Sequence, residues 1–285
     1  MFSFDKKILF SALLMLILVT IITSIILIFI NSRYTVIFLD KNYSFNQDRI
    51  IKNYYKHLIS YYQNYDLELP GDKFINLKLR KSITGGSNGN ELKALSKCEI
   101  DNNVSELDNK YVYKINKINK NRTALILIDI WECHYNGGWL KRANRLKKDK
   151  ILPLIELARK NNLPIIFVSY DTKMASDLNP QKGDLVSTDL NEIVEFLDSK
   201  KIKNLLYAGF ATNRCLMFRP AGMVNMKYNY YYDVILIRDA TIAFELPKTL
   251  KEELAKEVSI NIIEQRLGPS TTLMDLNKSF VNSVK

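Results

Sequence analysis

The segment Ala208-Gly-Phe-Ala-Thr-Asn-Arg-Cys-Leu216 joins two kinds of predicted secondary structure in this 285-residue chain. The run before it, residues 203–207, is typical of a buried strand, and the residues after it can form a helix. Cys215 is therefore expected at a strand-to-helix turn, where unpaired N–H groups stabilise a thiolate and a neighbouring oxyanion. A lone cysteine is more often a small buried apolar residue, so the turn alone leaves both interpretations open.

The order of residues in this turn matches a known sequence motif. Gly209-Phe-Ala-Thr-Asn-Arg-Cys215 resembles the nucleophile segment of the isochorismatase-like cysteine hydrolases. The resemblance continues in three further segments: Ala124-Leu-Ile-Leu-Ile-Asp-Ile-Trp131, Arg219-Pro-Ala-Gly-Met223 and Asp233-Val-Ile-Leu-Ile-Arg-Asp-Ala-Thr241. It covers roughly residues 120–275, and the details Trp131-x-x-His134 and Arg-Pro-x-Gly resemble amidohydrolase-like members rather than metal-dependent nicotinamidases.

The resemblance implies a catalytic group. Cys215 would be the nucleophile and Asp129, at the end of its strand, the general base; a cap after the strand is the plainer interpretation of Asp129. A lysine would complete the group. Lys182, upstream of Thr188-Asp-Leu190, is the first candidate and Lys173 the second, and a solvated surface lysine is the plainer interpretation of either.

The resemblance also implies how the reacting carbonyl is held. A cis peptide bond between Phe210 and Ala211 would turn the Ala211 N–H toward the site, where it forms an oxyanion hole with the Cys215 N–H. Thr212 and Asn213 would brace the turn. The side chains that would line the site are those of Trp131, His134 and Phe218; core packing is the alternative for the apolar rings, and a loop cap for His134.

Strand and helix patterns alternate along the second half of the chain. Strands are predicted at 123–128, 163–169, 205–208, 233–237 and 259–263, and helices at 151–160, 189–200, 216–226 and 247–256. This alternation predicts an α/β fold, a three-layer α/β/α arrangement around a mostly parallel sheet with Rossmann-like topology. Asp129 and Cys215 both follow strands, so they share the carboxyl edge of the sheet, where ligands bind in such folds.

Three regions are expected. Residues 1–32 form a membrane anchor, because the run 8–30 is apolar, uncharged and long enough to cross a bilayer; a cleaved signal peptide or a buried core helix are the alternatives. Residues 33–120 form a membrane-proximal extension with a helix at 48–65 and an edge strand at 110–115. Residues 121–285 form the hydrolase domain. Flanking charges leave the orientation in the membrane undecided.

Composition excludes several other classes. The net charge is +11, but lysines are scattered along the chain rather than gathered on one element, so nucleic-acid binding is not expected. Three cysteines make no disulfide framework, and two distant histidines make no zinc site, so we expect neither a metal nor another cofactor. The expected partners are a small-molecule substrate, the membrane and, by the resemblance, a further copy of the chain.

Three functions remain open on the sequence. The first is a cysteine-dependent hydrolase that cleaves an amide, or a related C–N or C–O bond, of a small molecule through a thioester-type intermediate. The alternative is a catalytically inactive, membrane-tethered binding or scaffold protein on the same fold. A third, weaker interpretation is a redox-sensing thiol, with Cys133 near Cys215.

Overall fold

The computed structural model of the protein describes residues 73–84, 109–170 and 173–282. The predicted membrane anchor at 1–32 and the predicted helix at 48–65 lie outside these residues. Within the described part of the chain, no helix combines the length and the apolar character that crossing a bilayer requires.

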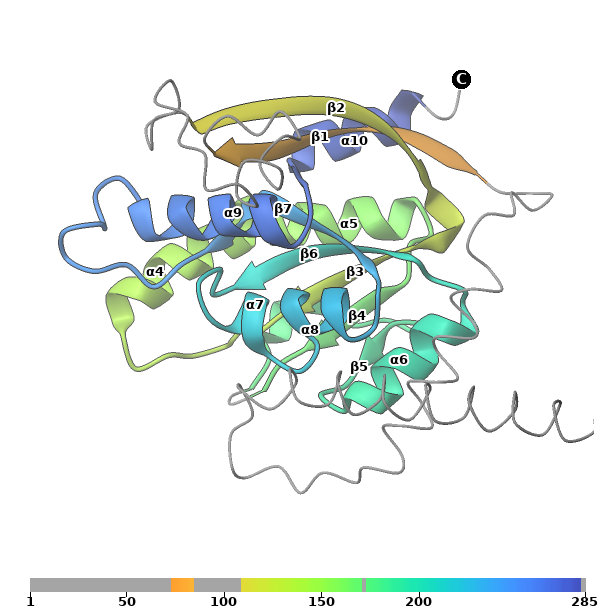
Figure 1. The fold of residues 1–285 in the computed structure, drawn as a ribbon. Helices are drawn as coiled ribbons and strands as arrows, with labels where there is room; N and C mark the ends of the chain where they lie inside the picture. Colours follow the sequence, from red (N-terminus) through yellow and green to blue (C-terminus); the bar gives the residue numbers. More distant parts are fainter. Residues whose placement is uncertain (1–72, 85–108, 171–172, 283–285) are drawn as a thin grey trace, which may run out of the picture. The chain divides into compact units, whose positions relative to one another are not determined.

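The described strands belong to one eight-stranded sheet in the order β2-β1-β8-β7-β6-β3-β4-β5 (Figure 1). The strands from β3 onward pair in parallel with one another, and β1 is antiparallel to both β2 and β8. The predicted α/β fold with a mostly parallel sheet is therefore confirmed. The strands are β1 (Phe74–Thr84), β2 (Asn109–Asn119), β3 (Thr123–Ile128), β4 (Ile165–Val168), β5 (Leu185–Val186), β6 (Asn204–Phe210), β7 (Asp233–Ile242) and β8 (Ser270–Thr271).

Helices cover both faces of this sheet because alternate strand residues, all apolar, point to opposite sides. One core contains Leu125, Leu127 and Phe167; the other contains Ile126, Ile128 and Val168. On the first face lie α4 (Gly137–Leu146), α5 (Leu152–Lys160) and α10 (Leu273–Asn282). On the second lie α6 (Leu190–Ser199), α7 (Cys215–Phe218), α8 (Met223–Tyr228) and α9 (Leu254–Arg266).

The predicted strand at 259–263 is wrong. These residues lie inside α9, and the short strand of this region is β8. The run Ser259-Ile-Asn-Ile-Ile263 has strand-like composition, but it buries Ile260 and Ile263 against the sheet and leaves Ile262 exposed. That is the spacing of one helix face, so packing against the sheet overrides local β-propensity. The predicted helix at 247–256 in fact begins at Leu254.

Two strands extend the sheet into the segment expected as an extension. β1 and β2 pair in register over their full length, and the predicted edge strand at 110–115 lies within β2, which is the outermost strand. Arg80 of β1 joins this hairpin to the rest of the molecule: its Nε donates to Glu264 Oε1 of α9 at 2.8 Å. The same oxygen accepts the hydroxyl of Ser270 at 2.5 Å. The hairpin is thus attached both by the pairing of β1 with β8 and by a buried ion pair to α9.

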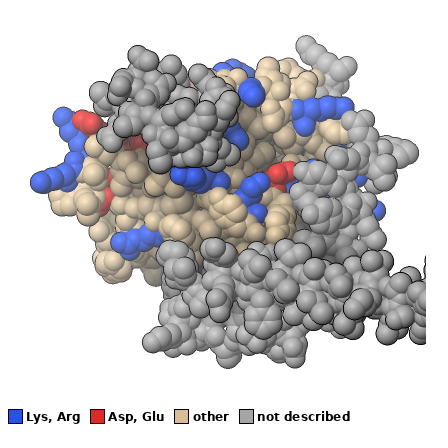
Figure 2. Space-filling view, viewed as in Figure 1, with Lys and Arg blue, Asp and Glu red and all other residues tan. Residues whose placement is uncertain are grey.

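The charged side chains are dispersed on the surface that can be seen. In Figure 2, Lys and Arg side chains form separate spots divided by uncharged surface on the face shown, with few acidic residues between them. One continuous basic stripe, the usual footprint of nucleic-acid binding, is not visible on this face.

We predict that Arg80→Met destabilises the fold strongly. Glu264 has no exposed side-chain area, so loss of Arg80 leaves a carboxylate buried without its charge partner, which costs about 3–5 kcal/mol. Urea unfolding followed by circular dichroism measures this loss. As the control, Lys227→Met breaks the partly exposed pair with Asp233 and should cost about 1 kcal/mol or less. Equal losses in the two variants would contradict a structural role for the Arg80–Glu264 pair.

Candidate active site

Asp129 is the residue directly after β3, and its side chain is fully buried. Its backbone adopts a left-handed conformation, with φ of 51°, while its N–H donates to the carbonyl of Val168 at 2.7 Å. The carboxylate has donors on both oxygens: the Tyr170 N–H on Oδ1 at 2.8 Å and Arg219 Nε on Oδ2 at 3.0 Å. Since strand end and donors fix its position, this carboxylate is preorganised rather than mobile.

Cys215 starts α7, as the sequence predicted, and its thiol hydrogen-bonds to Asp129. Burial, the charge of Asp129 and this hydrogen bond raise the pKa of the Cys215 thiol to about 12. The helix terminus was expected to lower that pKa. A single helical turn beside a buried carboxylate does not do so, because burial and the negative charge outweigh the N–H groups. The resting pair is therefore a thiol with an adjacent carboxylate acceptor.

Two backbone N–H groups also act on the sulfur. Those of Ala211 and Cys215 lower the pKa of the Cys215 thiol, against the larger effects of burial and Asp129. The bond between Phe210 and Ala211 is cis, as the resemblance implied. Donors that stabilise a thiolate are placed to hold an oxyanion beside it as well.

The close approach of β6 to β3 allows Cys215 to reach Asp129. Gly209 of β6 has φ of +124°, and a Cβ built there would lie 2.2 Å from the carbonyl oxygen of Ile128. No side chain fits at that separation. Glycine at 209 is what lets the turn before Cys215 lie against the residue that precedes Asp129.

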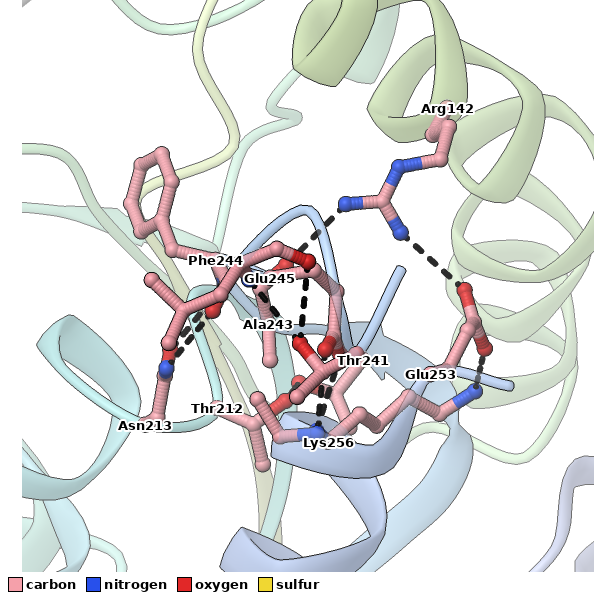
Figure 3. Close-up of polar contacts among 12 residues, drawn as sticks. Arg142, Thr212, Asn213, Thr241, Ala243, Phe244, Glu245, Glu253 and Lys256 are labelled. Atoms are coloured by element: carbon pink, nitrogen blue, oxygen red, sulfur yellow. Dashed lines mark hydrogen bonds and ion pairs between the residues drawn. The ribbon is translucent and has the colours of Figure 1, made fainter. Parts of the chain in front are cut away.

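Thr212 and Asn213 brace the turn. The hydroxyls of Thr212 and Thr241 are 2.7 Å apart, and Thr241 also donates to the Gly209 carbonyl at 2.8 Å. Asn213 pairs with the backbone of Phe244 in both directions, its Nδ2 donating at 2.9 Å and its Oδ1 accepting at 3.1 Å (Figure 3). The turn is therefore fastened to the end of β7 and the loop after it.

The same loop is held from its far side. Arg142 of α4 donates to the Ala243 carbonyl at 3.3 Å and to Glu253 at 3.2 Å (Figure 3). Glu245 accepts the N–H groups of Ala255 and Lys256, both at 3.0 Å, at the start of α9. These contacts fix the loop that carries Phe244, and so fix the position of its ring.

An aromatic cluster lies next to the turn and consists of Trp131, His134, Trp139, Phe210 and Phe244. Trp131 and His134 stack with 7° between their planes, and Trp139 stacks on Phe244 with centroids 4.7 Å apart. Both indole Nε1 groups are buried without a hydrogen-bond partner among the described residues. His134 Nδ1 accepts from the Asn136 N–H at 3.0 Å, which is the loop-capping role.

The structure does not bring Lys182 to Asp129 and Cys215. The chain after β4 returns along residues 130–132, where Ala175 donates to the Ile130 carbonyl, and then continues toward β5. Lys182 consequently lies exposed at the turn before β5. Lys173 is exposed too, and its carbonyl accepts the Glu132 N–H at 2.9 Å. Among the described residues, the cation in contact with Asp129 is Arg219.

Arg219 belongs to the Arg-Pro-x-Gly segment, from which the sequence predicts no role for it, and Tyr170, Trp139 and Phe244 are not predicted as site residues. A signal existed for Arg219, because it stands four residues after Cys215 and so on the same helix face. For the other three no local signal exists, since loops of distant origin bring them together. No group of three or more metal-ligating His, Cys, Asp or Glu side chains is found in the described part of the chain.

Comparisons with known proteins give similarity to solved structures alone, as no family model and no curated protein matches the chain. A cysteine hydrolase from Pseudomonas syringae is 17% identical, with 58% of this chain and 95% of that chain covered at a TM-score of 0.48. An octameric hydrolase of unknown specificity from Escherichia coli is 19% identical, with 57% and 80% covered at 0.44. An isochorismatase family protein from Burkholderia thailandensis is 19% identical, with 56% and 96% covered at 0.43.

We predict that Asp129→Asn speeds alkylation of Cys215. Removing the negative charge that raises the thiol pKa lowers that pKa, and each unit corresponds to roughly tenfold more thiolate at a pH below it. Iodoacetamide labelling of the full-length protein at pH 8, mapped by peptide mass spectrometry, gives the rate. In the unsubstituted chain Cys215 should react more slowly than the exposed Cys133.

The matched control is Asp239→Asn, which removes the carboxylate that pairs with Lys150 away from the site. Its labelling rate at Cys215 should equal that of the unsubstituted chain. Faster labelling of Cys215 than of Cys133 in the unsubstituted chain would show that the resting thiol is already ionised.

Proposed function

We propose that this chain is an isochorismatase-like hydrolase that uses Cys215 to cleave an amide, or a related C–N or C–O bond, of a small molecule. One observation carries the proposal: the Cys215 thiol hydrogen-bonds to a fully buried carboxylate while two backbone N–H groups act on its sulfur. Nucleophile, base and oxyanion donors are the components that acyl transfer requires, and here they meet at the carboxyl edge of a parallel sheet.

In the first half of the reaction the Cys215 proton passes to Asp129 as the sulfur attacks the carbonyl carbon. The C=O π electrons move onto oxygen, and the N–H groups of Ala211 and Cys215 stabilise the resulting oxyanion. When the oxyanion collapses, the C–N bond breaks, and Asp129 returns the proton to the departing amine. A thioester on Cys215 remains.

In the second half, water replaces the amine. Asp129, now ionised again, takes a proton from a water molecule that attacks the thioester carbon. The second tetrahedral intermediate collapses with loss of the sulfur, which recovers its proton from Asp129. The net reaction is amide plus water to acid plus amine, and both protein groups return to their starting states.

The raised pKa of the Cys215 thiol favours proton transfer during attack over a preformed thiolate. A thiol whose pKa lies near 12 has little thiolate at neutral pH, so the nearby carboxylate must accept the proton as the S–C bond forms. Because it is protonated, the Cys215 thiol reacts slowly with electrophiles and oxidants when no substrate is bound. This slow reaction argues against the redox-sensor interpretation.

The proposal extends to the surroundings of the enzyme. We propose that residues 1–32 form a membrane anchor, which is supported by the length and apolar composition of the run 8–30. We also retain self-association as part of the proposal. The E. coli structure described above is that of an octamer, and size-exclusion chromatography with light scattering measures the state of this chain.

We predict that Cys215→Ser abolishes hydrolysis and that Asp129→Asn lowers kcat roughly 10²- to 10⁴-fold, the usual contribution of a general base. The full-length protein, purified in a mild detergent, is incubated with a panel of small primary amides and a p-nitrophenyl ester. Ammonia release and absorbance give the rates, and intact mass detects an acyl group on Cys215.

Cys133→Ser is the matched control. It removes an exposed thiol from the segment after Asp129, and the variant should retain full activity. Unfolding midpoints of all variants show that the fold is intact. Turnover by the Cys215→Ser variant would refute the mechanism. Absence of both turnover and acylation across the panel would favour the binding or scaffold protein.

A further inference from the structure

We infer that Arg219 is the positioning cation of the catalytic group, an assignment that rests on the proposed function. Its Nε donates to Oδ2 of Asp129 at 3.0 Å, and the Asp129 side chain has no exposed area. Among the described residues, no other lysine or arginine forms an ion pair with this carboxylate. Arg219 therefore occupies the place that the sequence assigned to Lys182.

The nucleophile and the cation come from the same helical turn. Cys215 begins α7 and Arg219 caps it, the Arg219 N–H donating to the Cys215 carbonyl at 3.1 Å. Residues four apart lie on one face of a helix. Both side chains consequently reach the same carboxylate, and any displacement of α7 moves nucleophile and cation together relative to Asp129.

Tyr170 holds this arrangement from the opposite side. The guanidinium carbon of Arg219 lies 5.0 Å from the centroid of the Tyr170 ring, a cation–π contact. The Tyr170 N–H donates to the second oxygen of Asp129, and its hydroxyl accepts the Ala221 N–H at 3.2 Å. The Asp129 carboxylate is thus oriented by the Tyr170 N–H on one oxygen and by Arg219 on the other. The Arg219 guanidinium is oriented in turn by the ring of Tyr170.

Movement of charge during the reaction gives Arg219 its role. When the thiol proton passes to Asp129, the negative charge leaves the carboxylate for the sulfur, and it reaches the carbonyl oxygen once the S–C bond has formed. Arg219 keeps all of its protons and stays cationic. A fixed positive charge beside the Asp129–Cys215 pair stabilises each of these anions and favours loss of a proton from the pair.

Labelling of Cys215 tests this role without any substrate. In full-length protein at pH 8, Arg219→Gln should slow alkylation by iodoacetamide roughly tenfold, the change that one unit in thiol pKa produces. Arg219→Lys keeps the charge and should stay within about threefold of the unsubstituted chain. A merely structural Arg219 gives the opposite sign, because a loosened α7 exposes the thiol and speeds its alkylation.

Arg214→Gln is the matched control. Arg214 stands one residue before Cys215, carries the same charge and lies over the Phe244 ring rather than on Asp129. Its loss should change the rate less than threefold. Slowing as large as that of Arg219→Gln would show a general effect of net charge and overturn the assignment, as would unchanged or faster labelling in Arg219→Gln.

A second pair of variants covers the case in which Arg219→Gln fails to fold because Asp129 is left buried without a partner. Asp129→Asn with Arg219→Gln removes both charges, so no buried ion is left unpaired. This double variant should label roughly tenfold more slowly than Asp129→Asn alone; equal rates overturn the inference. Labelling does not depend on turnover, so an inactive amide panel would refute the proposed function without deciding the role of Arg219.

Discussion

Burial of one carboxylate organises the functional end of this molecule. Asp129 is removed from water at the end of a strand whose residues are all buried, and it must find its partners within the protein. They are the Tyr170 N–H, the Arg219 guanidinium and the Cys215 thiol. Tyr170 follows β4, whereas Cys215 and Arg219 begin and cap α7, so two distant parts of the chain have to converge on Asp129.

Convergence depends on how closely β6 approaches β3. Glycine at 209 permits contact with the Ile128 carbonyl that a Cβ would prevent, and the turn that follows delivers α7 to Asp129. The hydroxyls of Thr212 and Thr241, and the paired hydrogen bonds of Asn213, fasten this turn to β7. The site is therefore built from strand ends and tight turns, with rigidity supplied by hydrogen bonds of the short side chains of Thr212, Thr241 and Asn213.

The observed structure differs most from the sequence prediction where long-range packing, rather than local sequence, sets the conformation. Residues 259–263 have the composition of a strand, yet they lie in α9, where one helix face packs against the sheet and the other faces solvent. β1 and β2 also look peripheral in the sequence, but β1 pairs with β8, which makes the hairpin part of the sheet, and the buried pair of Arg80 with Glu264 ties it to α9. The conformation of residues 259–263 depends on the sheet against which α9 packs. The attachment of the hairpin depends on Glu264, which lies 184 residues after Arg80.

The sequence by itself determined the alternation of apolar strands and amphipathic helices, and with it a parallel sheet whose carboxyl edge holds Asp129 and Cys215. It did so because hydrophobic periodicity, and the order of the elements along the chain, can be read from short stretches of sequence. Only the tertiary structure decided which cation contacts Asp129 and whether the thiol is ionised at rest. Lys182 and Arg219 are equally charged in the sequence, but the loop after β4 carries one to the surface while α7 brings the other to the carboxylate. The thiol pKa likewise follows from burial and neighbours, which are properties of packing.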